Sequence, residues 1–172
     1  MKKISTYPIW SFNLSYTEEQ RNRMIAWVHK HNYVKALYTS ESYPVKPNKD
    51  FEGLYNTFVK IASSFLKFSL SENNSNLSWA FVSSAENSPA FWHNHMESST
   101  INGVYYLKVN KDEQGIRFRQ KNKEVLYKPK NNELLIFPNW LDHLPIPSKT
   151  SPRISINMEI LAKESAKSIF TN

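Results

Sequence analysis

The spacing of apolar residues changes once along the chain, from a helical period to a strand-like one. Apolar positions recur every three or four residues in two N-terminal stretches, and from Leu77 to about residue 160 they alternate with polar positions or form short apolar runs. The first pattern is typical of amphipathic helices and the second of strands. We therefore expect a mainly β protein with N-terminal helices, two of which cover one outer face of a sheet.

Two helices and one short strand are expected before residue 75. Residues 17–20, Thr-Glu-Glu-Gln, form a capping box, so a helix should begin there and end near Asn32. A second helix should begin at Asp50. Its apolar face is formed by Phe51, Leu54, Phe58, Ile61, Phe65 and Phe68. Alternation around Ile9 to Leu14 predicts a short strand before both helices.

The second half of the chain has the pattern of a β-sandwich or barrel. Short strands separated by turn-forming residues are expected near 77–84, 90–97, 102–109, 115–120, 124–127, 133–137 and 153–161. A chain of 172 residues is long enough for one domain with a sizeable core. We expect a single domain over 1–172, with a helical part over 1–74 and a β core over 75–162.

Composition narrows the chemistry that is available. The sequence has no cysteine, which excludes a disulfide framework and a cysteine nucleophile and leaves His, Asp and Glu as the strong metal ligands. The net charge is +7, but the basic residues are scattered. The densest basic run, over 117–130, has the pattern of a solvated hairpin, so we do not expect a nucleic-acid partner. No apolar stretch approaches the roughly 20 residues of a membrane span, and we expect a cytoplasmic protein without a signal peptide.

Two separate segments carry the candidate ligands. In Phe91-Trp92-His93-Asn94-His95-Met96-Glu97, both histidines and the glutamate occupy alternate positions, so an extended backbone would point them to one face. Imidazole and carboxylate groups in this arrangement could form half of a transition-metal site. The other half could come from His143, which we expect just beyond the end of the apolar strand that includes Leu134 and Phe137.

A third segment adds a polar row. In Arg153-Ile154-Ser155-Ile156-Asn157-Met158, polar and aliphatic residues alternate strictly, so the polar residues face either solvent or a polar cavity. The chain thus contains, in this order, a histidine pair on one expected strand, a distant histidine and an arginine shortly after it.

This order resembles the iron(II)- and 2-oxoglutarate-dependent oxygenases, over roughly residues 77–161. The resemblance rests on His93-Asn94-His95 or His95-Met96-Glu97, and on the Gly-Val-Tyr-Tyr-Leu stretch at 103–107. It also rests on His143 after Phe137-Pro138 and on Arg153 with Ser155. Small bacterial and phage members with a His-x-His motif are the most similar. The resemblance implies a double-stranded β-helix, a cupin-like jelly roll, and a dioxygenase that converts 2-oxoglutarate to succinate and CO₂ while it hydroxylates a substrate.

Two ligand sets remain open for Fe(II). In one, His93, His95 and His143 bind the metal; in the other, His95, Glu97 and His143 do. The likeness to His-x-His members favours the first set. The second set would partly neutralise the metal charge, because it includes an anionic ligand.

The resemblance also implies a site for 2-oxoglutarate, with O₂ as the other co-substrate. Arg153 can form a bidentate pair with the distal carboxylate of 2-oxoglutarate. Ser155, on the same face, and Tyr106 are expected to donate hydrogen bonds to the same carboxylate.

The primary substrate, a small molecule or a peptide, is not indicated by the sequence, and the loops around 39–49, 84–90 and 110–114 are expected to select it. The alternative function is a metal-binding cupin-type protein that does not use 2-oxoglutarate, which would have no need for Arg153.

Overall fold

The computed structural model describes residues 2–4, 7–31, 48–74, 77–83 and 90–171. In chain order the elements are β1 (Lys2–Lys3), β2 (Trp10–Asn13), α1 (Glu18–Lys30), α2 (Lys49–Phe65), β3 (Leu77–Ser83), β4 (Ile101–Lys108), β5 (Ile116–Gln120), β6 (Lys123–Tyr127), β7 (Glu133–Pro138), β8 (Asp142–Pro145), β9 (Arg153–Ile160) and α3 (Ala166–Thr171). The predicted loops at 39–49 and 84–90 lie almost wholly outside the described residues.

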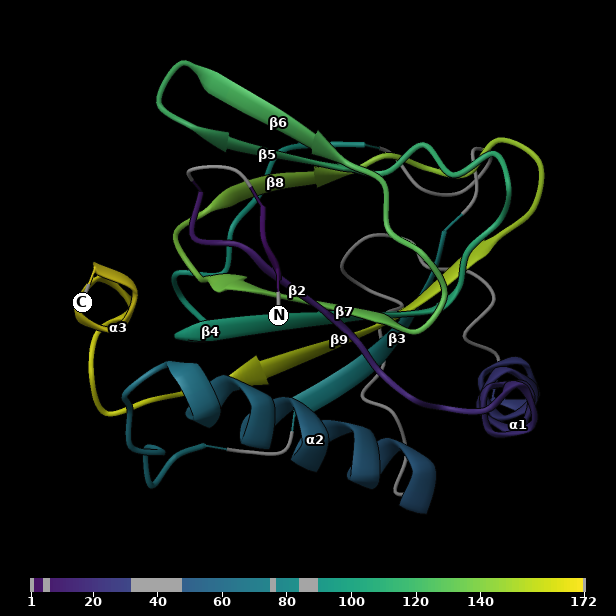
Figure 1. Ribbon diagram of the computed structural model, residues 1–172, viewed down its shortest axis with the longest axis horizontal. Helices are drawn as coiled ribbons and strands as arrows, with labels where there is room; N and C mark the ends of the chain where they lie inside the picture. The colour runs from purple at the N-terminus through teal and green to yellow at the C-terminus, as the bar shows by residue number, and fades with distance from the viewer. Residues whose placement is uncertain (1, 5–6, 32–47, 75–76, 84–89, 172) are drawn as a thin grey trace.

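Two antiparallel sheets form the body of the protein. The larger sheet has the strand order β1-β2-β7-β4-β9-β3, and the smaller one has the order β6-β5-β8. In Figure 1 the smaller sheet lies above the larger one and α2 lies below it. The expected mainly β architecture is therefore confirmed. β2, from the N-terminal part, pairs with β7 of the β core, so the two parts share one sheet.

The helices cover the outer face of the larger sheet, as expected. Phe51, Leu54 and Phe58 of α2 are buried in a core with the aliphatic residues of β9, Ile154, Ile156, Met158 and Ile160. Gly103 of β4 allows a close approach, because a Cβ atom at this position would lie 2.7 Å from the ring of Phe58. The short helix α3 also contributes a buried residue, Ile169, to this core.

A second core lies between the two sheets. Phe118 of β5 and Phe137 of β7 contact each other there, with ring centroids 5.1 Å apart. Tyr106 belongs to this inner core and Tyr105 to the outer one. Adjacent strand residues point to opposite faces, and the register therefore places Tyr106 toward the space between the sheets.

The predicted start of the first helix is confirmed. The Thr17 hydroxyl accepts a hydrogen bond from the Gln20 amide at 3.2 Å, and the Gln20 side chain accepts one from the Thr17 amide at 2.9 Å. The helix ends at Lys30, close to the expected end. Among the described residues, no helix is both long and apolar enough to cross a membrane.

One strand prediction was wrong, and one strand was missed. Residues 90–97 do not form a strand: the segment pairs with another strand only at His93, and the chain turns at residues 96–98. Conversely, His143 lies beyond the end of β7, as expected, but within a further short strand, β8, which was not predicted and which pairs with β5. Both differences have one physical cause. The 90–95 segment and β8 are held by a few contacts between residues distant in sequence, which local alternation does not report.

Candidate metal and co-substrate site

A cavity of about 690 Å³ lies between the two sheets. Its walls come from β3, β4, β5, β7, β8, β9 and the segment 91–98. The polar and ionisable lining residues are His93, Asn94, His95, Ser98, Asn102, Tyr106, His143, Arg153, Ser155, Asn157 and Glu159. All the residues that the sequence predicted for the first ligand set and for 2-oxoglutarate therefore line this cavity.

His93, His95 and His143 form one group in this cavity. One ring nitrogen from each residue can be chosen so that all three lie within 4.8 Å of one another. The ring centroids of His93 and His143 are 4.1 Å apart, and the rings of His95 and His143 are stacked at 5.2 Å. Three convergent imidazoles are a ligand set that suits zinc, copper, iron or nickel.

Backbone hydrogen bonds hold the two histidine segments together. The His93 amide donates to the His143 carbonyl at 3.0 Å, and the His143 amide donates to the His93 carbonyl at 2.9 Å. The His95 amide donates to the Asn139 carbonyl at 2.9 Å. These bonds place residues that are 50 positions apart in sequence at a fixed separation, so the group does not depend on side-chain packing alone.

The Nδ1 atoms of the histidines contact protein oxygens. In His143 this atom lies 3.0 Å from the Leu141 carbonyl, and in His95 it lies 2.8 Å from Glu159 Oε1. A proton on Nδ1 satisfies both contacts and leaves the Nε2 lone pair as the metal ligand. The Glu159–His95 contact thus has the arrangement of a carboxylate that orients a metal-binding histidine from behind.

Burial keeps two of these histidines neutral. It lowers the pKa of His93 to about 4, against a smaller opposing effect of the Phe91 carbonyl. Burial, followed by the neighbouring His93 and His95, also lowers the pKa of His143 well below its ordinary value. Neutral imidazole is the form that binds metals, so both side chains have the required protonation state at neutral pH.

A polar network fixes the outer side of the histidine group. Asn94, between the two histidines, donates to Asp142 at 3.0 Å, and Asp142 accepts from Arg119 at 3.2 Å. The Arg119 guanidinium lies 4.3 Å from the centroid of the Trp92 ring. Trp92, Asn94 and Asp142, which are neighbours of the histidines in sequence, therefore have partners, and Asp142 is not among the residues that line the cavity.

Arg153, Ser155 and Tyr106 lie together at another part of the cavity wall. Tyr106 of β4 is paired with Ser155 of β9, and the Arg153 guanidinium carbon lies 6.0 Å from the centroid of the Tyr106 ring. Burial raises the pKa of Tyr106 far above its ordinary value, so its hydroxyl keeps the proton that it could donate. The structure thus brings together the three residues predicted for 2-oxoglutarate.

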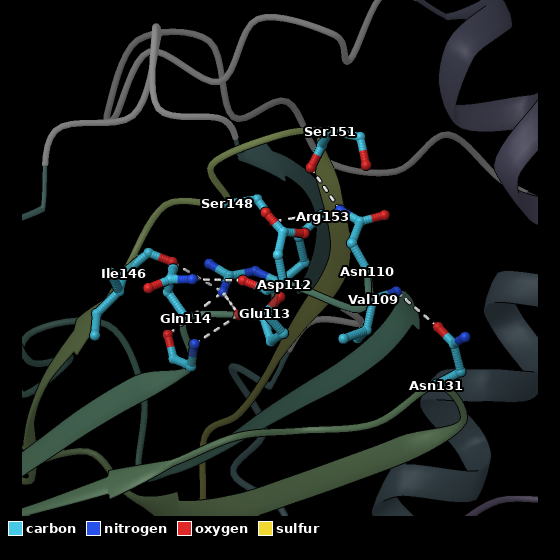
Figure 2. A network of polar contacts seen from close by, with 11 residues as sticks. Val109, Asn110, Asp112, Glu113, Gln114, Asn131, Ile146, Ser148, Ser151 and Arg153 are labelled. Atoms are coloured by element: carbon cyan, nitrogen blue, oxygen red, sulfur yellow. Dashed lines mark hydrogen bonds and ion pairs between the residues drawn. The ribbon is translucent and has the colours of Figure 1, made fainter.

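Arg153 already has a charged protein partner. Its Nη1 atom donates to Glu113 Oε1 at 2.6 Å, and both side chains are buried. Figure 2 shows this pair within the contacts of the loop between β4 and β5. Three polar atoms of cavity-lining residues are buried without a hydrogen-bond partner within the described part of the chain: Asn102 Nδ2, Arg153 Nε and Glu159 Oε2. Such atoms are typical of a site that receives a polar ligand.

Glu97 lies apart from the histidine group. It is exposed in the turn at residues 96–98, and it is not a member of the group of convergent ligand atoms. This placement favours the set of His93, His95 and His143 over the set that includes Glu97.

Two site residues were missed by the sequence analysis. Glu159 lies two positions beyond Asn157 in the polar row of β9, so the strand period could have found it. Glu113 lies in a loop, 40 positions from Arg153. No local pattern could have linked the two.

Among the comparisons with known proteins, only the one with solved structures bears on the fold. No protein-family model matches the sequence, and no curated protein matches it. Solved structures do match. One is a prolyl hydroxylase from Trichoplax adhaerens in complex with a hypoxia inducible factor peptide; the TM-score is 0.69 at 12% identity, over 91% of this chain and 84% of that one.

The structures of another prolyl hydroxylase and of a carbocyclase also match. A 2-oxoglutarate complex of a viral collagen prolyl hydroxylase from Paramecium Bursaria Chlorella virus-1 matches with a TM-score of 0.64 at 13% identity, over 90% of this chain and 96% of that one. A non-heme alpha ketoglutarate dependent carbocyclase of nogalamycin biosynthesis matches with a TM-score of 0.63 at 10% identity, over 93% of this chain and 83% of that one. The chain has the double-stranded β-helix fold of these oxygenases.

Proposed function

We propose that the protein is an Fe(II)- and 2-oxoglutarate-dependent dioxygenase. It would couple oxidative decarboxylation of 2-oxoglutarate to succinate and CO₂ with hydroxylation of a small-molecule or peptide substrate. The observation that carries the proposal is one cavity lined both by the three convergent histidines and by Arg153, Ser155 and Tyr106. The oxygenase fold of the structural neighbours supports it.

His93, His95 and His143 would hold the metal, and Fe(II) would supply the oxidative chemistry with O₂. Three protein ligands leave positions open for a chelating 2-oxo acid and for O₂. Arg153, Ser155 and Tyr106 would hold the distal carboxylate of 2-oxoglutarate through charge-assisted hydrogen bonds. The protein thereby orients the co-substrate and excludes water from the reacting atoms.

The substrate would enter beside an apolar wall. Leu77, Trp79 and Phe81 occupy alternate positions of β3 and line the cavity, as does Phe91. The Trp79 and His95 ring centroids are 6.4 Å apart, and those of Phe91 and His93 are 5.7 Å apart. The target carbon would therefore approach the metal between two aromatic side chains.

The test is succinate release from 2-oxoglutarate, with Fe(II), O₂ and pools of candidate substrates. His143→Ala is the blank, because it removes one proposed ligand from the group. Binding is measured independently as the rise in melting temperature that 2-oxoglutarate causes in the presence of Mn(II), as linkage requires. The proposal fails if Mn(II) alone raises the melting temperature while millimolar 2-oxoglutarate adds no further shift.

One observation favours a second candidate, a metal-binding cupin-type protein that does not use 2-oxoglutarate. Arg153 is paired with Glu113 at 2.6 Å, so a purely structural role for the arginine is consistent with its contacts. The same melting experiment separates the two functions. The second candidate predicts stabilisation by the metal and no effect of 2-oxoglutarate on either the melting temperature or succinate release.

A further inference from the structure

Glu113 is a buried carboxylate in the loop between β4 and β5. Only 6% of the residue is exposed. Its Oε1 atom accepts hydrogen bonds from Arg153 Nη1 at 2.6 Å and from the Gly115 amide at 2.8 Å. Figure 2 shows Glu113 beside Arg153, opposite the carbonyl of Ile146. The arginine that lines the cavity is therefore bound from the loop side by an opposite charge.

The contacts of Arg153 are concentrated on one nitrogen. Nη1 also donates to the carbonyls of Ile146 at 3.1 Å and Gly115 at 3.4 Å, whereas Nε has no hydrogen-bond partner in the described structure. Arg153 lines the cavity, and Glu113 is not among the lining residues. The loop thus holds one corner of the guanidinium and leaves the remaining N–H groups for a ligand.

The loop itself is held in place independently of Arg153. Asn110 donates to the Ser151 carbonyl at 2.5 Å and lies 3.3 Å from the Ser148 hydroxyl. Asp112 accepts from the Thr150 amide at 3.1 Å. These contacts lie just before Glu113, and just after it the Gly115 carbonyl accepts from the Ile146 amide at 3.0 Å. Because the loop is held on both sides of Glu113, its carboxylate would stay beside Arg153 when a ligand binds.

We propose that Glu113 sets the strength and the charge preference of co-substrate binding by neutralising Arg153. The inference rests on the proposed function, in which the distal carboxylate of 2-oxoglutarate binds at Arg153. The distal carboxylate would therefore approach the buried Arg153–Glu113 ion pair, which has no net charge. The attraction by Arg153 is then largely offset by repulsion from Glu113, since both act across a poorly screened interior. Glu113 is a positioning residue that acts on the co-substrate through Arg153.

The test compares two ligands on two carboxylate variants. Glu113→Gln removes the charge and keeps an oxygen that can accept from Nη1 and from the Gly115 amide. Asp112→Asn is the matched control, because it makes the same change one residue away at a side chain that contacts Thr150. Dissociation constants for 2-oxoglutarate and for 2-oxopentanoate, which lacks the distal carboxylate, are measured by titration calorimetry with Mn(II).

Glu113→Gln is expected to bind 2-oxoglutarate at least about tenfold more tightly than the wild type, because one nearby like charge is removed. Its affinity for 2-oxopentanoate and both affinities of Asp112→Asn should be unchanged. Equal or weaker 2-oxoglutarate binding by Glu113→Gln, or the same gain for both ligands, overturns the proposal. If neither 2-oxo acid binds any of these proteins while Mn(II) does, the proposed function fails and the role of Glu113 fails with it.

A measurement on the wild type tests the same idea if Glu113→Gln does not fold. An arginine already neutralised should prefer 2-oxoglutarate over 2-oxopentanoate by less than about tenfold, because the pairing of a charge with a vacant buried partner is worth more than this. A larger preference shows that Arg153 acts with its full charge and contradicts the proposal.

Discussion

At the scale of single residues, the convergent ligand atoms found among the described residues are all imidazole nitrogens, and Glu159 contacts one of these histidines from behind. Glu159 Oε1 contacts His95 Nδ1 at 2.8 Å and accepts from the Ser98 hydroxyl at 2.9 Å. A carboxylate in this position fixes the ring orientation and increases the electron donation of the ligating nitrogen. In the proposed metal site, Glu159 would thus supply a carboxylate one step away from the metal, behind His95.

The first prediction concerns the two ligand sets. His93→Ala should abolish stoichiometric binding of Mn(II), because it removes one of the three convergent imidazoles. Glu97→Ala should bind Mn(II) as the wild type does, because Glu97 is exposed in the neighbouring turn. Equilibrium dialysis followed by metal analysis checks both variants. The opposite result, with binding lost only in Glu97→Ala, would favour the set of His95, Glu97 and His143.

The second prediction concerns Glu159. Glu159→Gln should weaken Mn(II) binding by about 10- to 100-fold, the usual effect of losing a carboxylate behind a ligating histidine. Ser98→Ala removes a neutral contact to the same oxygen and should have a smaller effect. The dissociation constants are compared by competition with a chelator of known affinity. An unchanged constant in Glu159→Gln would mean that the carboxylate only packs against His95.

At the scale of elements, β4 links the helical layer to the cavity. Gly103 faces Phe58 of α2, whereas Val104 and Tyr106 face the space between the sheets. A substitution that shifts the β4 backbone from one face therefore also moves the side chains on the other face. The position of α2 helps to determine where Tyr106 lies relative to Arg153.

The third prediction follows from the contact between Gly103 and Phe58. Gly103→Ala should destabilise the fold by about 1–3 kcal/mol, the usual cost of overpacking a core. Gly53→Ala is the control, since no atom lies within 4 Å of a Cβ there. It should instead stabilise α2 by about 0.5–1 kcal/mol. Urea denaturation of both variants measures these changes in the free energy of unfolding.

A second substitution tests whether the contact with Phe58 causes the destabilisation expected for Gly103→Ala. Phe58→Leu shortens the side chain that the new methyl group would meet, so the double variant should be more stable than the sum of the two single changes predicts. Strict additivity would show that Gly103 is required for a reason other than its contact with Phe58.

The sequence identified those site residues that share a local period. His93 and His95, and also Arg153 and Ser155, alternate within one segment, and Tyr106 of the Gly-Val-Tyr-Tyr stretch lines the cavity with them. β8 was missed because its four residues, Asp-His-Leu-Pro, have no pattern of their own and are ordered by pairing with β5. Glu113 was missed for the same physical reason, because its partner is distant in sequence.

At the scale of the whole molecule, buried tyrosines govern behaviour at high pH. Burial, and next the hydrogen bond to Glu133, raise the pKa of Tyr127 from 10.0 to about 12. Burial also raises the pKa values of Tyr16, Tyr55, Tyr105 and Tyr106. The folded protein therefore retains protons on these hydroxyls at pH values where the unfolded chain releases them.

The fourth prediction gives the sign of this effect. Below about pH 10 these tyrosines are protonated in both states, so their contribution to stability is fully present. As the pH rises from 10 to 12, only the unfolded state loses the protons, and the free energy of unfolding must fall. Tyr127→Phe should show a shallower fall over this range. Denaturation at a series of pH values tests this, and parallel curves for the two proteins would contradict it.

The reciprocal hydrogen bonds between His93 and His143 have a consequence for how the proposed metal would be loaded. Both amides are satisfied by protein carbonyls, so neither needs an ion to be paired. Stripping the metal should therefore leave these two amide protons slow to exchange with deuterium. Activity should return on simple addition of Fe(II), without denaturation and renaturation. A cell could then supply iron to this protein after translation is complete, whenever iron becomes plentiful.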